Sequence, residues 1–493
     1  MDQHVPSTTS AWWAAVAAFA LAVFLRMPSC YESFWLDELH SAWVIWDGLA
    51  EVYPRSVIGH QSPIYFYILW FWKQIVGESE MLLRLSSVIP VALSCSLITV
   101  AVARWCNSIP AGLTGGAVLA VENNSLFFGT ELRPYGFIIL CASVATISFV
   151  KMWSTESRHQ QPKTWCILIA SIILGAIIQP TSLGVLAWLP AALLGRWFLV
   201  DRRKLASVTP LDGLSALSIV LAAVWLWRIT LQESWQQKSI WAAFGSATDP
   251  HQILQAWNWT WLLAVPLILL LIGFFVRWRL TELKLDPSHS VCLLMLAALA
   301  FGTTCLYWIG SRLELAPIWH RRYFVAVIPL LAVICGGCVG YLQHSIPKSR
   351  IGLPVGCLGA LILIAGIGFG QRTIQQLTRY PVALVVRGED WRGAIKWIAE
   401  HSTVDDRVLV DAGLIEGHAW IRADLLLAEN ELKRDYLTLP ASGPYFTGRQ
   451  QFPVGSDLLP IEDAPEKNTV DPRPVFILTR RSAARVPARN PSD

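Results

Sequence analysis

The amino-acid sequence predicts a polytopic α-helical membrane protein with a small α/β domain after its last span. Of the 493 residues, 54% are hydrophobic and only 15% are charged, whereas a soluble domain usually carries about 25% charged residues. Apolar stretches long enough to cross a bilayer recur as far as residue 370, where the composition becomes charged and rich in Pro. The 25 Trp residues also favour a membrane protein, because the indole ring suits the interface between lipid and water.

The charge and cysteine content give no support to two other classes of protein. The net charge of +4 is small and spread over many loops, so nothing indicates a nucleic-acid partner. The ten Cys residues lie in or beside apolar segments, which indicates small buried thiols rather than a disulfide framework. Cys335 and Cys338 have the spacing of a redox motif but lie inside an apolar run, so we interpret them in the same way. No Lys or Arg precedes the first apolar stretch and no clear cleavage site follows it, so we expect a retained span.

The predicted spans follow from apolar length, since about 20 apolar residues are needed to cross the hydrocarbon core. Eleven stretches are near this length: 11–27, 85–103, 111–128, 134–152, 164–179, 181–199, 211–229, 259–276, 291–310, 323–342 and 351–369. A shorter stretch, 63–76, is interrupted by Lys73. We expect that stretch to lie in the membrane interface rather than to cross it.

The basic loops orient these spans, because Lys and Arg collect in cytoplasmic loops. The four basic loops are Lys151–Lys163, Arg196–Lys204, Arg277–Lys284 and Lys348–Arg350. They share one side if every stretch from 134 onward crosses the membrane. Asp37 and Glu131 then share the opposite side only if 63–76 does not cross, which predicts eleven spans, an inside N-terminus and an outside C-terminus. A twelve-span alternative would place these two acidic loops on opposite faces.

The C-terminal part has the patterning of a soluble domain. Its pattern predicts one helix and two strands, at 389–400, 407–411 and 474–478. The last stretch, 480–493, is expected to be disordered. The sequence therefore predicts a transmembrane catalytic domain over residues 1–370 and an extracytoplasmic α/β domain over residues 371–493.

An acidic pair, Asp37-Glu38, follows the first apolar stretch in a loop that also holds Trp35 and His40. Carboxylates at a bilayer surface ionise without the cost of burial in hydrocarbon. An enzyme that acts on a lipid-linked substrate needs its base and any metal ligands at this depth. The plain alternative is that these residues only end an interfacial helix.

Two further groups of polar residues lie on the same predicted side. His60 shortly precedes Pro63, which starts the short apolar stretch, and an ordinary loop would also explain it. Glu131, Arg133 and Tyr135 follow the stretch 111–128, where a satisfied ion pair is the alternative.

The fourth group, Arg321, Arg322 and Tyr323, opens the stretch 323–342 from the outer side. Two adjacent arginines there oppose the positive-inside tendency, and a guanidinium group binds phosphate through two parallel hydrogen bonds. Snorkelling of the side chains to the membrane surface is the alternative. Together the four groups suit a phosphate group that leaves a lipid carrier while a carboxylate acts as base toward an acceptor.

The order of these motifs resembles that of the GT-C glycosyltransferases. The similar segments are Trp35-Leu-Asp-Glu38, His60-Gln-Ser-Pro-Ile-Tyr65, Gly77-Glu-Ser-Glu80, Arg84-Leu-Ser-Ser87, Glu131-Leu-Arg-Pro-Tyr135 and Arg322-Tyr323. The chain is most similar to the glycosyltransferase family 39 group, which includes the protein O-mannosyltransferases and is related to the lipid A aminoarabinose transferase. The resemblance covers roughly residues 11–345.

The resemblance implies a donor sugar on a polyprenyl phosphate, with a lipid, glycan or protein as the acceptor. It implies that Asp37 is the base or a ligand of a divalent metal ion, Mg or Mn, and that Glu38 completes the acidic pair. Glu131 would be a second carboxylate that could share the metal. Arg133 and Tyr135 match the family's Arg-Pro-Tyr step and would contact substrate.

The resemblance also implies that Arg321 and Arg322 contact the carrier phosphate, with His60 and Tyr323 nearby in substrate binding. The segment His60-Gln-Ser-Pro63 departs from the His-Pro-Pro step and following Lys of the protein mannosyltransferases, which counts against a protein acceptor. The expected location is the inner cell membrane, with the active site and the C-terminal domain extracytoplasmic and membrane lipids as further partners.

Two other functions explain the spans equally well. A transporter or flippase of lipid-linked glycans predicts charged residues within the spans, and Glu122 is the main residue of that kind. A polysaccharide ligase or polymerase would depend on outer-loop arginines more than on an acidic pair. Transport needs a sealed vesicle and transfer does not, so the two classes can be separated by experiment.

Overall fold

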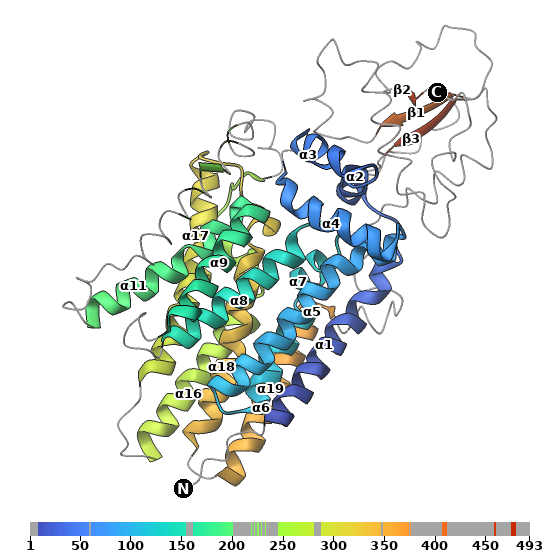
Figure 1. The fold of residues 1–493 in the computed structure, drawn as a ribbon. Helices are drawn as coiled ribbons and strands as arrows, with labels where there is room; N and C mark the ends of the chain where they lie inside the picture. Colours follow the sequence, from blue (N-terminus) through green and yellow to red (C-terminus); the bar gives the residue numbers. More distant parts are fainter. Residues whose placement is uncertain are drawn as a thin grey trace, which may run out of the picture.

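The computed structural model describes residues 8–58, 61–153, 161–200, 245–280, 287–346 and 349–373, together with three short strands and a few isolated positions. Over these residues the chain forms a bundle of long helices (Figure 1). Three shorter helices lie together at one end of the bundle. They are α2 (Leu36–Val44), α3 (Leu49–Ile58) and α4 (Pro63–Val76).

Seven helices in the described part of the chain are long and apolar enough to cross a membrane. They are α1 (Thr8–Cys30), α5 (Glu80–Trp105), α8 (Tyr135–Trp153), α16 (Val265–Leu280) with the turn η5 (Thr260–Ala264) before it, α17 (Pro287–Arg312), α18 (Ile328–Ser345) with η7 (Val325–Val327) before it, and α19 (Ser349–Gly370). Two shorter apolar helices accompany them, α6 (Ile109–Val121) and α9 (Pro162–Ile178). Each corresponds to a stretch predicted to span, so the chain is a polytopic helical membrane protein.

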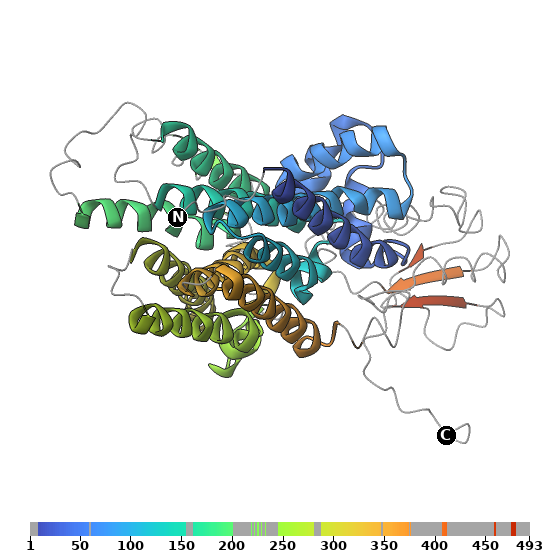
Figure 2. The same ribbon diagram turned by 90° about the horizontal axis from the view of Figure 1, so that it is seen from below.

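Seen from below, the N-terminal and C-terminal helices form two groups (Figure 2). Helix α6 joins them, since it packs against α5 and α1 in one group and against α18 and α19 in the other. Small residues allow this approach: a Cβ at Gly336 of α18 would lie 2.5 Å from the carbonyl oxygen of Ala111 in α6. Helix α18 is buried along its length and forms the centre of the bundle.

The predicted stretch 111–128 is two helices rather than one. Helix α6 ends at Val121, and α7 (Asn123–Phe128) begins after Glu122. The Glu122 carboxylate caps α7, because it accepts hydrogen bonds from the Ser125 backbone N–H at 2.7 Å and from Asn124 Nδ2 at 2.8 Å. Glu122, the main charged residue within a predicted span, therefore has a structural role as the cap of α7.

The predicted stretch 181–199 is also interrupted. It holds the turn η2 (Pro180–Ser182) and the helices α10 (Leu183–Leu186) and α11 (Trp188–Val200). Helix α9 ends just before Pro180, which has no N–H to continue the helical ladder. The predicted stretch 211–229 falls outside the described residues, except for isolated positions.

Lys73 explains how a charge is accommodated in the apolar helix α4. Its ammonium group donates to the Trp46 and Ile45 carbonyl oxygens just after the end of α2, and it lies 3.1 Å from the Glu78 carboxylate. Helix α4 thus packs beside α2 and α3 at one end of the bundle (Figure 1), which fits the predicted interfacial position.

The three strands form a parallel sheet in the order β2 (Leu458–Leu459), β1 (Arg407–Asp411), β3 (Val475–Thr479). Strand β1 matches its predicted range. Strand β3 begins and ends one residue later than the predicted range 474–478. Parallel neighbours need a crossover connection. The residues between these strands lie outside the described part of the chain, so the α/β domain stays a prediction. The predicted helix 389–400 and the terminal stretch 480–493 lie outside the described residues.

Candidate functional site

The loop between α1 and α2 contacts the loop before α8. The Leu132 backbone N–H donates to Glu38 Oε1 at 2.8 Å, and Arg133 Nη1 donates to the Asp37 carbonyl oxygen at 3.2 Å. The two acidic loops therefore meet at one end of the bundle, while the count of eleven spans stays a prediction.

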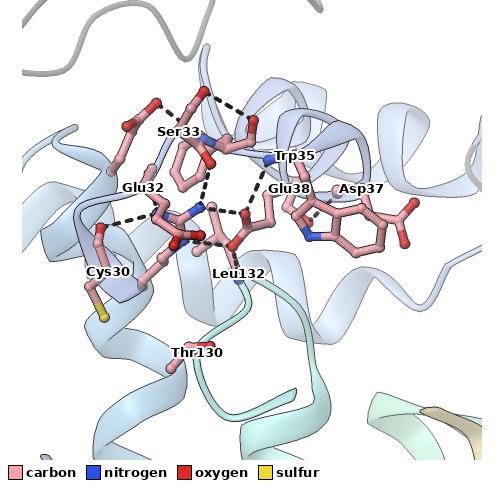
Figure 3. A network of polar contacts seen from close by, with 12 residues as sticks. Cys30, Glu32, Ser33, Trp35, Asp37, Glu38, Thr130 and Leu132 are labelled. Carbon is pink, nitrogen blue, oxygen red and sulfur yellow. Dashed lines mark hydrogen bonds and ion pairs between the residues drawn. The ribbon is translucent and has the colours of Figure 1, made fainter. Parts of the chain in front are cut away.

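A buried ion pair fixes the first of these loops. Arg84 Nε lies 2.8 Å from Glu38 Oε1 and Arg84 Nη2 lies 2.6 Å from Oε2, and both side chains are fully buried. Glu38 also accepts from the Trp35 backbone N–H at the start of α2. Arg84 donates in addition to three loop carbonyl oxygens, those of Cys30, Glu32 and Ser33 (Figure 3).

In this network Glu38 occupies a buried structural position, whereas the sequence predicted that it belongs to the catalytic pair. Both of its oxygens already accept hydrogen bonds, and no part of the side chain meets solvent. The geometry favours Glu38 as the residue that holds the loop and Asp37 as the residue that meets a ligand.

The Asp37 side chain leaves α2 on another face, because successive residues of a helix point about 100° apart. Figure 3 shows its carboxylate directed away from the Glu38 network. Asp37 Oδ2 lies 3.0 Å from Arg322 Nη1 and 3.8 Å from Arg133 Nη2. A quarter of the Asp37 side chain is exposed, so it is the accessible carboxylate of the pair.

Arg133 is fixed in front of Asp37 by the start of α8. Ser87 Oγ donates to the Arg133 carbonyl oxygen at 3.2 Å, and a Cβ at Gly136 would lie 2.6 Å from the Ser87 carbonyl oxygen. Burial lowers the pKa of Arg133, but Asp37, Tyr135 and Glu131 together outweigh burial and the charge of Arg322, and the pKa is raised. Arg133 therefore keeps its charge beside Asp37.

Arg322 is held through its backbone by residues from two elements. It lies in the turn η6 (Arg321–Tyr323); its N–H donates to His320 Nδ1 at 3.3 Å, and its carbonyl oxygen accepts from Gln179 Nε2 at 3.2 Å. Burial and then the charge of Arg322 lower the pKa of His320 to about 4, so the ring is neutral at physiological pH. Gln179 and His320 were not predicted as site residues.

The aromatic residues of the motifs surround the same guanidinium group. Arg322 lies over the Tyr323 ring at 5.5 Å, and its side chain donates to the hydroxyl of Tyr135, the first residue of α8. Four of the predicted substrate-binding residues are thus brought together around Asp37 and Arg322: Arg133, Tyr135, Tyr323 and Arg322 itself.

Arg321 differs from its neighbour. Its Nη1 donates to Asn124 Oδ1 at 3.4 Å and its Nη2 to the Gln255 carbonyl oxygen at 2.8 Å, so it is directed away from Asp37. Only one residue of the predicted basic pair therefore faces the acidic loop. His60 lies outside the described residues.

The residues present do not fit the predicted divalent metal. Asp37 faces two guanidinium groups, which would repel a cation at the same oxygen. Glu131 is buried, and its carbonyl oxygen accepts from the Arg133 N–H at 2.8 Å. Within the described residues, no group of three or more His, Cys, Asp and Glu side chains is placed to hold a metal ion.

A comparison with protein families supports the resemblance over part of the chain. Residues 60–227 match a family model described as dolichyl-phosphate-mannose-protein mannosyltransferase. The chain resembles the GT-C glycosyltransferases. The match includes Arg84, Arg133 and Tyr135, and it lies outside the segments that hold Asp37 and Arg322.

Solved structures give weaker similarities. The oligosaccharyltransferase of Archaeoglobus fulgidus is 12% identical, with a TM-score of 0.43, and covers 80% of this chain, which spans 59% of that protein. ArnT from Cupriavidus metallidurans, bound to undecaprenyl phosphate, is 15% identical, with a TM-score of 0.46, over 83% of this chain and 84% of its own. No curated protein matches the chain.

Proposed function

We propose that this protein transfers a sugar from a polyprenyl-phosphate donor to an acceptor hydroxyl at the extracytoplasmic face of the cell membrane. The observation that carries the proposal is the accessible Asp37 carboxylate, set between Arg133 and Arg322 beside a bundle of apolar helices. The matched family model supports the donor class, since dolichyl-phosphate mannose is a polyprenyl-phosphate sugar. Lipid, glycan and protein all remain acceptor classes in this proposal.

The chemistry is a single displacement at the anomeric carbon. The acceptor oxygen attacks that carbon while its proton passes to the Asp37 carboxylate. The bond from the carbon to the phosphate oxygen breaks, and its electron pair leaves with the carrier phosphate. Arg133 and Arg322 are fixed cations that stabilise the charge on the departing phosphate.

The polar network behind Asp37 supplies its position. Glu38 and Arg84 fix the first loop, and Leu132 ties that loop to the second. Because these side chains are buried, the backbone that carries Asp37 is held in one geometry without contact between Glu38 and the substrate. Such preorganisation confines any rearrangement during the reaction to the Asp37 side chain itself.

Turnover in detergent tests the function. Purified protein would be mixed with a panel of polyprenyl-phosphate hexoses and pentoses and with membrane extract as the acceptor source. We expect donor consumption and release of polyprenyl phosphate, followed by mass spectrometry, without any sealed compartment. Turnover that appears only as movement across sealed vesicles would instead favour a flippase.

His320 offers a test of how Arg322 is positioned. The change His320→Ala removes the acceptor of the Arg322 N–H, and we expect it to lower the transfer rate roughly tenfold, as for one lost hydrogen bond. His320→Asn keeps a side-chain oxygen near the place of Nδ1 and should retain most of the rate. The rates would be compared across pH 5–8. Equal loss in both variants would indicate that the imidazole ring itself takes part in the chemistry.

A further inference from the structure

The Asp37 carboxylate lies where an anion would be bound. It is the acid partner of both Arg133 and Arg322, at 3.8 Å and 3.0 Å, and these two arginines come from different outer loops. The inference below rests on the proposed function, because it concerns the carrier phosphate at this same site.

The two arginines retain donors for a larger anion. Arg133 Nε and Arg322 Nε are buried, and neither has a hydrogen-bond partner among the residues that the structure describes. A buried donor without a partner is costly, so such groups usually meet a ligand or water. Arg84 is a useful contrast, since its Nε and both terminal nitrogens bond to Glu38 and to loop carbonyl oxygens.

A phosphate group would compete with Asp37 for these donors. It carries more charge than a carboxylate and presents more acceptor oxygens, and guanidinium groups bind it in the same bidentate way. A carboxylate paired with cations is a weak base, because a nearby positive charge favours its ionised form. The pairing seen here therefore holds Asp37 in an unreactive arrangement.

We propose that Asp37 occupies the anion site of the unliganded protein, and that the carrier phosphate displaces it from Arg133 and Arg322 and so frees it to act as the base. The donor would then bind before the acceptor is activated. The acceptor hydroxyl meets a competent base only when the leaving group is in place.

The proposal makes an unusual prediction for Asp37→Asn. This change removes a negative charge that competes with phosphate for two guanidinium groups within 4 Å. We expect the variant to bind polyprenyl phosphate about 10- to 100-fold more tightly than the wild-type protein, even though its transfer is lost.

Binding would be measured in detergent with two ligands, polyprenyl phosphate and the uncharged polyprenol. The matched control is Asp47→Asn, since Asp47 forms a comparable pair with Arg55 away from the site. Asp37→Asn should tighten binding of the phosphate only, and Asp47→Asn should change neither affinity. Asp37→Glu keeps the charge and should not tighten binding, whereas Asp37→Ser should act like Asp37→Asn.

The outcomes separate this inference from the proposed function. If the wild-type protein prefers the phosphate to polyprenol but Asp37→Asn and Asp37→Ser bind it no more tightly, the competition is disproved and the function stands. If neither the wild-type protein nor Asp37→Asn prefers the phosphate, both the competition and the proposed function fail.

Discussion

Replacement of Asp37 by Asn should lower the rate of sugar transfer by about 10²- to 10⁴-fold, the usual contribution of a general base. The amide cannot take the proton of the acceptor hydroxyl, whereas its size and its place on α2 are nearly unchanged. The rate would be measured from release of polyprenyl phosphate by the purified variant in detergent. Membrane insertion should be intact, because the Asp37 side chain is partly exposed and lies outside the network that fixes the loop.

The control for this experiment is again Asp47→Asn. Asp47 lies between α2 and α3 and pairs with Arg55, and its loss should leave the transfer rate within about twofold of the wild-type value, as for a partly exposed ion pair. Full activity in a well-inserted Asp37→Asn protein would show that the base lies elsewhere.

Replacement of Arg84 by Met should destabilise the folded protein by about 3–5 kcal/mol, because it leaves the fully buried Glu38 carboxylate without its counter-ion. The change also removes the donors that hold the Cys30, Glu32 and Ser33 carbonyl oxygens. We expect a lower midpoint of thermal unfolding in detergent and a loss of transfer, since the loop that carries Asp37 loses its anchor.

A second change distinguishes an unpaired charge from lost packing. Adding Glu38→Leu to Arg84→Met removes the stranded carboxylate and should restore part of the stability, but not the transfer rate. The change Arg55→Met, at the partly exposed pair with Asp47, should cost much less than Arg84→Met. An Arg84→Met protein as stable as Arg55→Met would contradict the anchoring role of Arg84.

Helix existence could be predicted from the sequence because apolar length is a strong signal. The long helices α1, α5, α8, α17, α18 and α19 correspond to predicted stretches. The break inside the stretch 111–128 was missed for a local reason. Glu122 caps a new helix there, and one Glu does not change the mean hydropathy enough to reveal the interruption.

The site was predicted in part, since sequence order cannot say which side chains converge. Asp37, Arg133 and Arg322 do meet, but adjacent Glu38 and Arg321 are directed elsewhere. Arg84 gave a signal that could have been used, because an arginine near the start of an apolar helix needs a partner. Gln179 gave no such signal apart from its position before Pro180. Its partner, the Arg322 carbonyl oxygen, lies far along the chain.

The anomeric configuration of the product tests the central claim most directly, namely that Asp37 serves as base in one displacement of the carrier phosphate. A donor of known configuration would be turned over in detergent by the wild-type protein, and the new glycosidic bond would be assigned by NMR. Our account predicts inversion at the anomeric carbon. Retention would require a double displacement or an attack from the face of the leaving group, and would contradict it.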